Sequence, residues 1–347
     1  MNNKIWQEDL ERLAGADWID WNRLKQKTIL ITGANGLIGS SLIRGLMYIN
    51  QKYNLKINVV ALVRDKDKAL KKFADLVEDD NSLLIIQGNV EHKIMIHQDI
   101  DFIIHGASPT ASRYFIEKPV ETIKTSVNGT INMLELAVNK KVKSFVFLSS
   151  MEIYGSTQYD NLLSEKDIGY INPLIVRNCY PESKRQCEAL CAAYADEYNV
   201  PTMSIRLAQT FGQGVDKKDA RVFAEFARCV KDKKNIVLFT EGESKRCYLY
   251  TMDAVSAIFT VLLKGESGKA YNAGNPATYC SIKEMAQMVT HELANDVITV
   301  KYSENLQVHK RYMPPHFLNL DMTEISKLGW KPTLGLKEMY LRILEDM

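Results

Sequence analysis

In the first half of the chain, short runs of aliphatic and β-branched residues alternate with longer stretches in which apolar residues recur every three or four positions. The short runs predict buried strands, and the longer stretches predict amphipathic helices. Strands are predicted at residues 28–31, 57–63, 83–90, 101–109 and 144–150, and helices at residues 40–50 and 119–140. Because strand and helix alternate, we expect an α/β fold built on a doubly wound parallel sheet.

After a further strand at residues 201–207 the alternation becomes irregular. Helices are predicted at residues 219–230, 251–259, 282–293 and 334–347, and strands at 236–239 and 297–302. Ser281 is followed three residues later by Glu284, which predicts a capping box at the start of the 282–293 helix. Asp321 is expected to cap a short helix that ends at Leu328.

Residues 1–27 precede the first predicted strand. Ile5, Leu10 and Leu13, separated by charged residues, predict a short amphipathic helix, and Trp18 and Trp21 are expected to pin this extension onto the domain. A role in covering a cofactor or in a dimer contact stays open, but plain packing is the favoured interpretation.

The composition gives no reason to expect nucleic-acid or membrane binding. The 347 residues are 46% hydrophobic and 25% charged, with a net charge of +2, and they contain no leader-like or membrane-length apolar run. The six cysteines form no C-x-x-C pair, so we expect free thiols in a reducing cytoplasm and no metal site. Lys71 and Lys72 lie in a charge-rich segment that is expected to be solvated.

A glycine motif, T-G-x-x-G-x-x-G, lies between the first predicted strand and the helix that follows it. This order of strand, glycine turn and helix predicts dinucleotide binding. Gly33 permits the tight turn, Gly36 lets a pyrophosphate approach the backbone, and Gly39 lets the helix pack closely, with its N-terminus facing the anion. The cofactor contacts predicted here are Gly33, Asn35, Gly36, Leu37, Ile38 and Gly39.

The second predicted strand ends at Arg64 and Asp65, where such folds meet the adenosine ribose. Arg64 favours a 2′-phosphate and therefore NADP. Alternatively, Arg64 is solvated or stacks on the adenine and Asp65 takes the ribose, so both NAD and NADP stay open. Asn89 and Val90, after the third strand, and Ala107 and Ser108, after the fourth, complete the predicted cofactor contacts.

Candidate catalytic residues follow the fifth predicted strand. Ser150 ends that strand, and Tyr180 and Lys184 stand four residues apart, so on a helix they share one face. The Lys184 ammonium beside the phenol would lower the pKa of Tyr180. Tyr180 could then take a hydroxyl proton while hydride leaves for a nicotinamide, with Ser150 holding the same oxygen.

These features together make the chain resemble the extended short-chain dehydrogenase/reductases, in particular the nucleotide-sugar epimerase/dehydratase family. The pattern is nearest to the UDP-glucuronate decarboxylases and dTDP-glucose 4,6-dehydratases. The supporting stretches are residues 105–109, 122–125, 129–134, 152–155, 178–185, 206–212 and 328–332. The resemblance implies a Rossmann-type sheet with a smaller C-terminal α/β domain, and oxidation at C4 of a nucleoside-diphosphate sugar by a tightly held NAD(P)⁺ that is recycled.

Several positions depart from the family pattern. Met151 replaces an acidic residue that the dehydratases use, which puts dehydration by their mechanism in doubt, whereas Glu152 survives and could act at C5 or C6. Glu152 could instead have a purely structural role as a buried carboxylate paired with an arginine or lysine. A role in the site is favoured. Ser126 and Gln209 stand where the family carries asparagines.

The resemblance also implies residues that contact the substrate. Arg246 matches an arginine that grips the diphosphate, and Arg311 is a second candidate of that kind. Arg177 could meet a sugar carboxylate, which would favour decarboxylation, or could be a charge at a helix start. The full predicted set is Thr110, Met151, Arg177, Gln209, Val222, Arg246 and Arg311.

The implied organisation divides the chain into three parts. Residues 1–27 form an extension, residues 28–207 a nucleotide-binding domain with a return near 245–263, and residues 208–244 and 264–347 a substrate domain. The apolar stripes of the 119–140 helix and of a helix over 182–194 match a four-helix homodimer interface in the family; alternatively, both stripes only face their own sheet.

The leading hypothesis is therefore an NAD(P)-dependent epimerase/dehydratase-type enzyme with Tyr180, Lys184, Ser150 and Glu152 as catalytic residues. UDP-glucuronate decarboxylation is the alternative within the same chemistry. A catalytically silent NAD(P)-binding sensor or scaffold is the alternative from a different class, suggested by Met151, Ser126 and Gln209.

Overall fold

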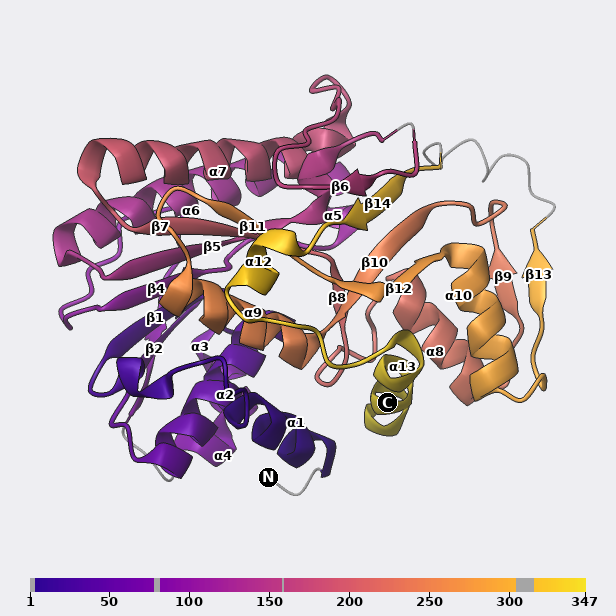
Figure 1. The fold of residues 1–347 in the computed structure, drawn as a ribbon, viewed down its shortest axis with the longest axis horizontal. Helices are drawn as coiled ribbons and strands as arrows, with labels where there is room; N and C mark the ends of the chain where they lie inside the picture. Colours follow the sequence, from indigo (N-terminus) through magenta and orange to yellow (C-terminus); the bar gives the residue numbers. More distant parts are fainter. Residues whose placement is uncertain (1–3, 78–81, 158, 304–314) are drawn as a thin grey trace.

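The computed structural model describes residues 4–77, 82–157, 159–303 and 315–347 (Figure 1). Its main sheet has seven parallel strands in the order β11-β7-β5-β4-β1-β2-β3. Their bounds are β1 Thr28–Thr32, β2 Asn58–Val63, β3 Leu83–Gln87, β4 Phe102–His105, β5 Ser144–Ser150, β7 Thr202–Leu207 and β11 Ala270–Ala273. The expected doubly wound parallel sheet is confirmed.

Alternate residues of each central strand enter two separate apolar cores, one on either face of the sheet. In β1, Ile29 and Ile31 join one core and Leu30 joins the other. The first core is completed by helices α1 (Lys4–Ala14), α2 (Leu37–Tyr53) and α9 (Thr251–Lys264), and the second by α6 (Pro119–Lys140) and α7 (Cys179–Tyr198). A sheet buried on both faces explains why its strands read as continuous apolar runs.

A second group of elements lies beside the carboxyl ends of the main strands (Figure 1). It contains a five-stranded sheet, with path β12-β10-β14-β6 and β8 on β10, and the pair β13-β9. The strands are β6 Leu162–Leu163, β8 Gln209–Phe211, β9 Ile236–Leu238, β10 Lys245–Tyr250, β12 Asn275–Ser281, β13 Val300–Tyr302 and β14 Phe317–Leu320. Its helices are α8 Val222–Asp232, α10 Ile282–Met288 with a π-turn over Val289–Leu293, and α13 Leu336–Asp346; the short helix α12 Thr323–Lys327 packs instead on β11 of the main sheet (Figure 1).

This arrangement differs in detail from the expected division of the chain. β11 closes the main sheet although it lies beyond the expected return near residues 245–263, and β10 lies within that range but pairs in the second sheet. The division into domains stays a prediction, but the two sheets exchange segments more often than the sequence pattern indicates.

Local signals placed most element boundaries well. Strand β5 and helix α6 have the predicted bounds, and Ser281 and Glu284 form the predicted capping box. Strands β3 and β4 end earlier than predicted, just before Gly88 and Gly106, because glycine interrupts a strand. The remaining short elements are α3 Lys66–Lys72, α4 Ala74–Val77, α5 Ser112–Glu117 and the 3-10 turns Trp21–Leu24, Met151–Tyr154 and Val176–Asn178.

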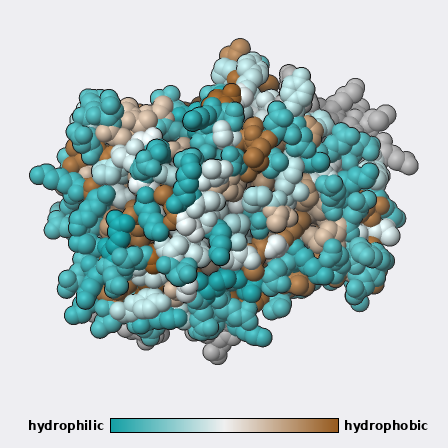
Figure 2. Space-filling model, viewed as in Figure 1, coloured by the Kyte–Doolittle hydropathy of each residue, from teal (hydrophilic) through white to brown (hydrophobic). Residues whose placement is uncertain are grey.

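The surface and side-chain chemistry agree with an ordinary globular domain. Figure 2 shows polar side chains over most of one face, with small apolar areas between them. Over the described residues, no helix is long and apolar enough to cross a membrane, and no group of histidine, cysteine or acidic side chains could hold a metal ion. All six cysteines are free thiols.

Candidate active site

The glycine turn after β1 is too tightly packed for side chains. Gly33 has φ +69°, and a Cβ there would lie 2.7 Å from the Gly106 carbonyl oxygen. A Cβ on Gly39 would lie 2.4 Å from the Gly33 carbonyl oxygen. Only glycine fits both positions, so the turn brings the N-terminus of α2, with Leu37 and Ile38 in its first turn, beside the ends of β1 and β4.

Thr32 joins the ends of these two strands. Its hydroxyl lies 2.7 Å from His105 Nδ1 and accepts hydrogen bonds from the amides of Gly106 and Ala107, both at 3.1 Å. Burial lowers the pKa of His105 to about 3, so this imidazole is neutral at pH 7 and holds backbone rather than moving protons. Ala107 and Ser108 are thereby fixed at the predicted cofactor edge.

The segment after β2 packs against the glycine turn. The Asn35 side chain donates to the Asp65 carbonyl oxygen at 2.9 Å, and Lys72 Nζ donates to the Asn35 carbonyl oxygen at 3.0 Å. The Asp65 carboxylate caps α3 by accepting from the Lys68 amide, and the Arg64 side chain is exposed. Lys72 was expected to be solvated; instead burial lowers its pKa, because α3 lays it against the turn.

The other predicted cofactor residues lie near the carboxyl ends of β3 and β4. The Asn89 side chain accepts from the Glu91 amide at 3.2 Å, and Val90 is buried against Gly129 of α6. Ser108 Oγ lies 3.2 Å from Ser126 Oγ, at the position where the family pattern carries asparagine. Ser126 therefore presents a shorter side chain, with a hydroxyl group, where the family pattern has an asparagine amide.

Ser150, Tyr180 and Lys184 converge at the end of β5. The Ser150 side chain accepts from the Glu152 amide at 3.2 Å and lies near enough to the Tyr180 hydroxyl to lower its pKa by hydrogen bonding. Tyr180 stacks on Phe115 with ring centroids 4.3 Å apart and planes 8° apart. Phe115 is not among the residues predicted from the sequence, since α5, which carries it, contains no motif.

Lys184 is buried on the same face of α7 as Tyr180. Its Nζ donates to the Leu148 carbonyl oxygen at 2.6 Å, and lies 4.6 Å from the Phe147 ring centroid and 5.7 Å from that of Tyr180. Burial lowers the pKa of Lys184 to about 8. Although the i, i+4 spacing placed the pair correctly, the ammonium is satisfied by the strand backbone.

The expected lowering of the Tyr180 pKa is wrong for this structure. The pKa is raised, first by burial and then by the negative charge of Glu152. The Ser150 hydrogen bond and the charges of Arg177 and Arg221 oppose the rise without overcoming it. The phenol is therefore protonated at neutral pH in this state, because burial of a phenolate outweighs the neighbouring cations.

Glu152 forms an ion pair with Arg177. Two contacts, Nη1–Oε2 at 2.5 Å and Nη2–Oε1 at 3.2 Å, make the pair bidentate, and each side chain is 27% exposed. The Arg177 guanidinium also lies 5.6 Å from the Phe115 ring centroid. The structural alternative for Glu152, a carboxylate paired with an arginine, is therefore confirmed. Because the pair lies beside Tyr180, a role for Glu152 in the site stays a prediction.

Two further arginines belong to the second group of elements, and the charge of one of them, Arg221, acts on Tyr180. Arg221, at the start of α8, pairs with Asp219 and lies close enough to Tyr180 for its charge to act on that phenol. Arg246 on β10 donates to His316 Nε2 at 2.9 Å, and its buried Nε has no partner among the described residues. Arg221 was not among the predicted site residues.

The remaining predicted substrate residues differ in how far they are exposed to solvent. Met151 is buried, Gln209 on β8 is partly buried, and Thr110 and Val222 are exposed. Arg311 lies outside the described residues. The roles assigned to all of these residues stay predictions.

The depressed pKa of Lys184 predicts how stability changes with pH. Between about pH 8 and 10.5 the native lysine is neutral while the unfolded one, with its ordinary pKa of 10.5, is protonated. The unfolded state then binds more protons, so stability should rise by up to about 1.4 kcal/mol per pH unit relative to Lys184→Met. Urea unfolding of cofactor-free protein at pH 7, 8.5 and 10 measures the difference, and a pH-independent difference would contradict it.

Comparison with known proteins identifies relatives of the same fold and sequence pattern. A family model described as the NAD dependent epimerase/dehydratase family matches residues 29–274. UDP-glucuronic acid decarboxylase 5 of Arabidopsis thaliana is 32% identical over 323 residues, covering 92% of this chain and 88% of the relative.

Two solved structures share the fold. UDP-N-acetylglucosamine 4-epimerase of Methanobrevibacter ruminantium superposes with a TM-score of 0.78 at 17% identity, over 93% of this chain and 98% of the other. UDP-glucuronic acid 4-epimerase of Bacillus cereus, solved with UDP-glucuronic acid and NAD, has a TM-score of 0.75 at 20% identity, over 92% and 98%.

Proposed function

The chain belongs to the NAD-dependent epimerase/dehydratase family, and we propose that it oxidises C4 of a nucleoside-diphosphate sugar and later reduces the same carbon. The observation that carries this proposal is the convergence of Ser150, at the end of β5, with Tyr180 and with Lys184, which is buried on the same face of α7 as Tyr180. In this proposal Ser150 holds the C4 hydroxyl and Tyr180 takes its proton. Lys184 supplies a positive charge on the same helix face as Tyr180.

The residues around the glycine turn fit a dinucleotide. A Cβ at Gly33 or Gly39 would strike backbone, so the turn keeps the close approach that a pyrophosphate needs, and the N-terminus of α2 favours its charge. Bound NAD would supply a hydride acceptor that is regenerated within each turnover. The residues proposed to hold it are Gly33, Asn35, Gly36, Leu37, Ile38, Gly39, Asn89, Val90, Ala107, Ser108, Tyr180 and Lys184.

Arg64 and its surroundings support a preference for the 2′-phosphate of NADP over NAD. The Asp65 carboxylate is engaged as the cap of α3, whereas the Arg64 side chain is exposed at the end of β2. Lys68 and Lys72 add positive charge to the same segment, and a guanidinium pairs well with phosphate. Identification of the nucleotide released from denatured protein tests this preference, and release of NAD alone would exclude it.

Decarboxylation of a nucleoside-diphosphate uronic acid is the second candidate for the net reaction. Arg177 stands beside Tyr180 in a bidentate pair with Glu152, and a guanidinium held there could exchange its partner for a sugar carboxylate. Met151 is buried and has no proton to give a departing hydroxyl, which disfavours dehydration. The similarity to UDP-glucuronic acid decarboxylases points the same way.

Mass spectrometry of the products from a panel of nucleotide sugars tests the proposal. We expect conversion of at least one substrate: loss of carbon dioxide from UDP-glucuronic acid for decarboxylation, or an isomer of unchanged mass for epimerisation. Loss of water would mean dehydration despite Met151. If no nucleotide sugar is converted while NAD or NADP is found bound, the catalytically silent binder replaces this proposal.

Substrate contacts are proposed for residues from both halves of the chain. Arg246 is proposed to bind the diphosphate, since its buried Nε lacks a partner among the described residues. Arg177 and Arg221 are proposed to lie near the sugar because their charges reach Tyr180. Thr110, Met151, Gln209, Val222 and Arg311 complete the proposed set.

A homodimer through α6 and α7 is proposed for the assembly. The two helices pack side by side, and Val120 and Ile123 on α6 are exposed apolar side chains. A single-chain mass in sedimentation equilibrium would exclude the dimer.

The six free thiols support a reducing compartment such as the cytoplasm.

A further inference from the structure

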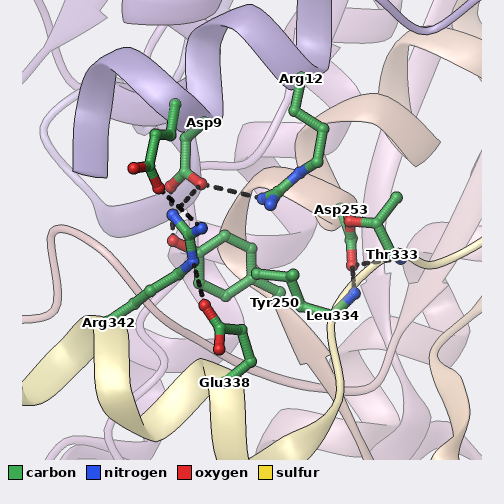
Figure 3. A network of polar contacts seen from close by, with 9 residues as sticks. Asp9, Arg12, Tyr250, Asp253, Thr333, Leu334, Glu338 and Arg342 are labelled. Carbon is green, nitrogen blue, oxygen red and sulfur yellow. Dashed lines mark hydrogen bonds and ion pairs between the residues drawn. The ribbon is translucent and has the colours of Figure 1, made fainter. Parts of the chain in front are cut away.

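A buried carboxylate in the N-terminal helix joins three distant segments of the chain (Figure 3). Asp9 is 0% exposed and accepts from Tyr250 Oη at 2.5 Å, Arg12 Nη2 at 2.9 Å and Arg342 Nη1 at 3.0 Å. Tyr250 ends β10 and Arg342 lies on α13. One side chain therefore ties helix α1 to the strand of Arg246 and to the C-terminal helix.

The helix that carries Asp9 is seated on the nucleotide-binding side. Leu13 of α1 packs on Gly45 of α2, where a Cβ would lie 2.7 Å from the leucine methyl group. Trp6 lies 5.5 Å from the Arg44 guanidinium, measured to the indole ring. Because α2 begins at the glycine turn, α1 is anchored to the element that positions the cofactor.

Tyr250 carries the connection to the substrate side. Its ring packs directly on Gly212, where a Cβ would lie 2.4 Å from the ring, and its backbone pairs with Phe211 of β8. The chain leaving Gly212 leads to Arg221, and the strand that ends at Tyr250 carries Arg246. Both proposed substrate arginines therefore lie a short way along the chain from Tyr250 or Gly212, and Tyr250 contacts Asp9.

The C-terminal helix strengthens the same junction. Arg342, whose side chain is 12% exposed, also bonds Glu8 at 3.0 Å and Glu338 at 3.2 Å. The Asp346 carboxylate accepts from the Gly214 amide at 3.2 Å, which holds the loop after β8 from the other side. Asp9 and Arg342 are largely buried. If one of them is removed, water therefore cannot fully solvate the charge that remains on the other.

We propose that Asp9 is a positioning residue for the substrate half of the active site. Through Tyr250 and Arg342 it fixes β10 and residues 212–221 relative to the nucleotide-binding sheet, and so sets where Arg221 lies beside Tyr180 and where β10 presents Arg246. The proposal rests on the proposed function, because it assigns these arginines to the nucleotide sugar. It gives the N-terminal extension a part in substrate binding without any contact to substrate.

Tyr250→Phe tests the connection with the smallest change, since it keeps the ring on Gly212 and removes one hydrogen bond to a buried carboxylate. We expect KM for the converted nucleotide sugar to rise about tenfold, with kcat changed less than about threefold and bound dinucleotide unchanged. Asp9→Asn should raise KM at least as much. Hydrogen exchange should be faster in residues 212–221 and 245–250 of both variants.

Two control variants separate positioning from loss of stability. Val142→Ala removes packing from the core on the other face of the main sheet, outside the network around Asp9, and Glu338→Gln neutralises an exposed member of that network. We expect Val142→Ala to lower the melting temperature at least as far as Tyr250→Phe without raising KM, and Glu338→Gln to change neither. An equal rise of KM in Val142→Ala, or an unchanged KM in Tyr250→Phe, would overturn the proposal.

Failure of the proposed function gives a different result. If the wild-type chain converts no nucleotide sugar, KM is undefined, and the exchange measurement on cofactor-loaded protein decides the positioning role alone. Faster exchange confined to residues 212–221 and 245–250 in Tyr250→Phe would uphold the junction. Unchanged exchange there would remove it regardless of activity.

Discussion

Tyr180→Phe is expected to lower kcat by about a thousandfold or more, because it removes the one group proposed to take the C4 proton. Ring stacking on Phe115 should be kept, since only the hydroxyl is lost. The dinucleotide should stay bound, because the glycine turn and α2 are unchanged. Product formation from the converted nucleotide sugar and the nucleotide content of the purified variant measure the two effects.

Tyr194→Phe is the matched control for this variant. Tyr194 lies on the same helix and stacks on Tyr198, away from the site, so activity should be close to that of wild type. Conversion that survives Tyr180→Phe at the wild-type rate would rule out Tyr180 as the base. Loss of activity together with loss of dinucleotide would point to damaged cofactor binding instead.

Arg206→Met is expected to give the largest loss of stability. Arg206 is 5% exposed on β7 and bonds Glu188 at 2.7 Å, the Glu165 carbonyl oxygen at 2.8 Å and the Tyr154 hydroxyl at 3.0 Å. Removing it leaves the Glu188 carboxylate, whose side chain is only 14% exposed, without its cation, which costs about 3–5 kcal/mol. Urea unfolding of the cofactor-free variant measures this loss.

The partner substitution distinguishes a buried-charge effect from lost packing. Arg206→Met combined with Glu188→Gln should recover much of the stability, since no unpaired charge remains. Arg113→Met, which breaks an exposed ion pair with Glu117, should leave unfolding unchanged. If the double variant is as unstable as Arg206→Met alone, packing around the arginine is the cause.

The sequence predicted the features that depend on local spacing. The glycines at 33, 36 and 39 indicate a tight strand-to-helix turn, and at 33 and 39 only a residue without a Cβ fits the crowded backbone. The i, i+4 spacing of Tyr180 and Lys184 puts both on one face of α7 wherever that helix lies. Strand and helix periods likewise gave the doubly wound sheet, since they reflect which faces are buried.

Which side chains meet across the site was decided by tertiary structure. Glu152 and Arg177 pair over a separation of 25 residues, and Arg221 reaches Tyr180 from a different helix. No local period relates such positions, because the path of the chain between them sets their distance. The same holds for β11, which pairs with β7 in the main sheet although the strands between them in the chain belong to other sheets.

Protonation was decided at the same level. The sequence correctly brought a lysine beside Tyr180 but gave the wrong direction for the tyrosine pKa, because spacing does not report how deeply a phenol is buried or that Glu152 lies near it. Lys72, which was expected to be solvated, donates to the backbone of Asn35, and Asp9, a charged residue of the N-terminal helix, is buried against Tyr250. Local pattern determined the elements and the motif geometry of this protein, whereas desolvation and charge pairing, which depend on every neighbour in space, were decided only when the chain had folded.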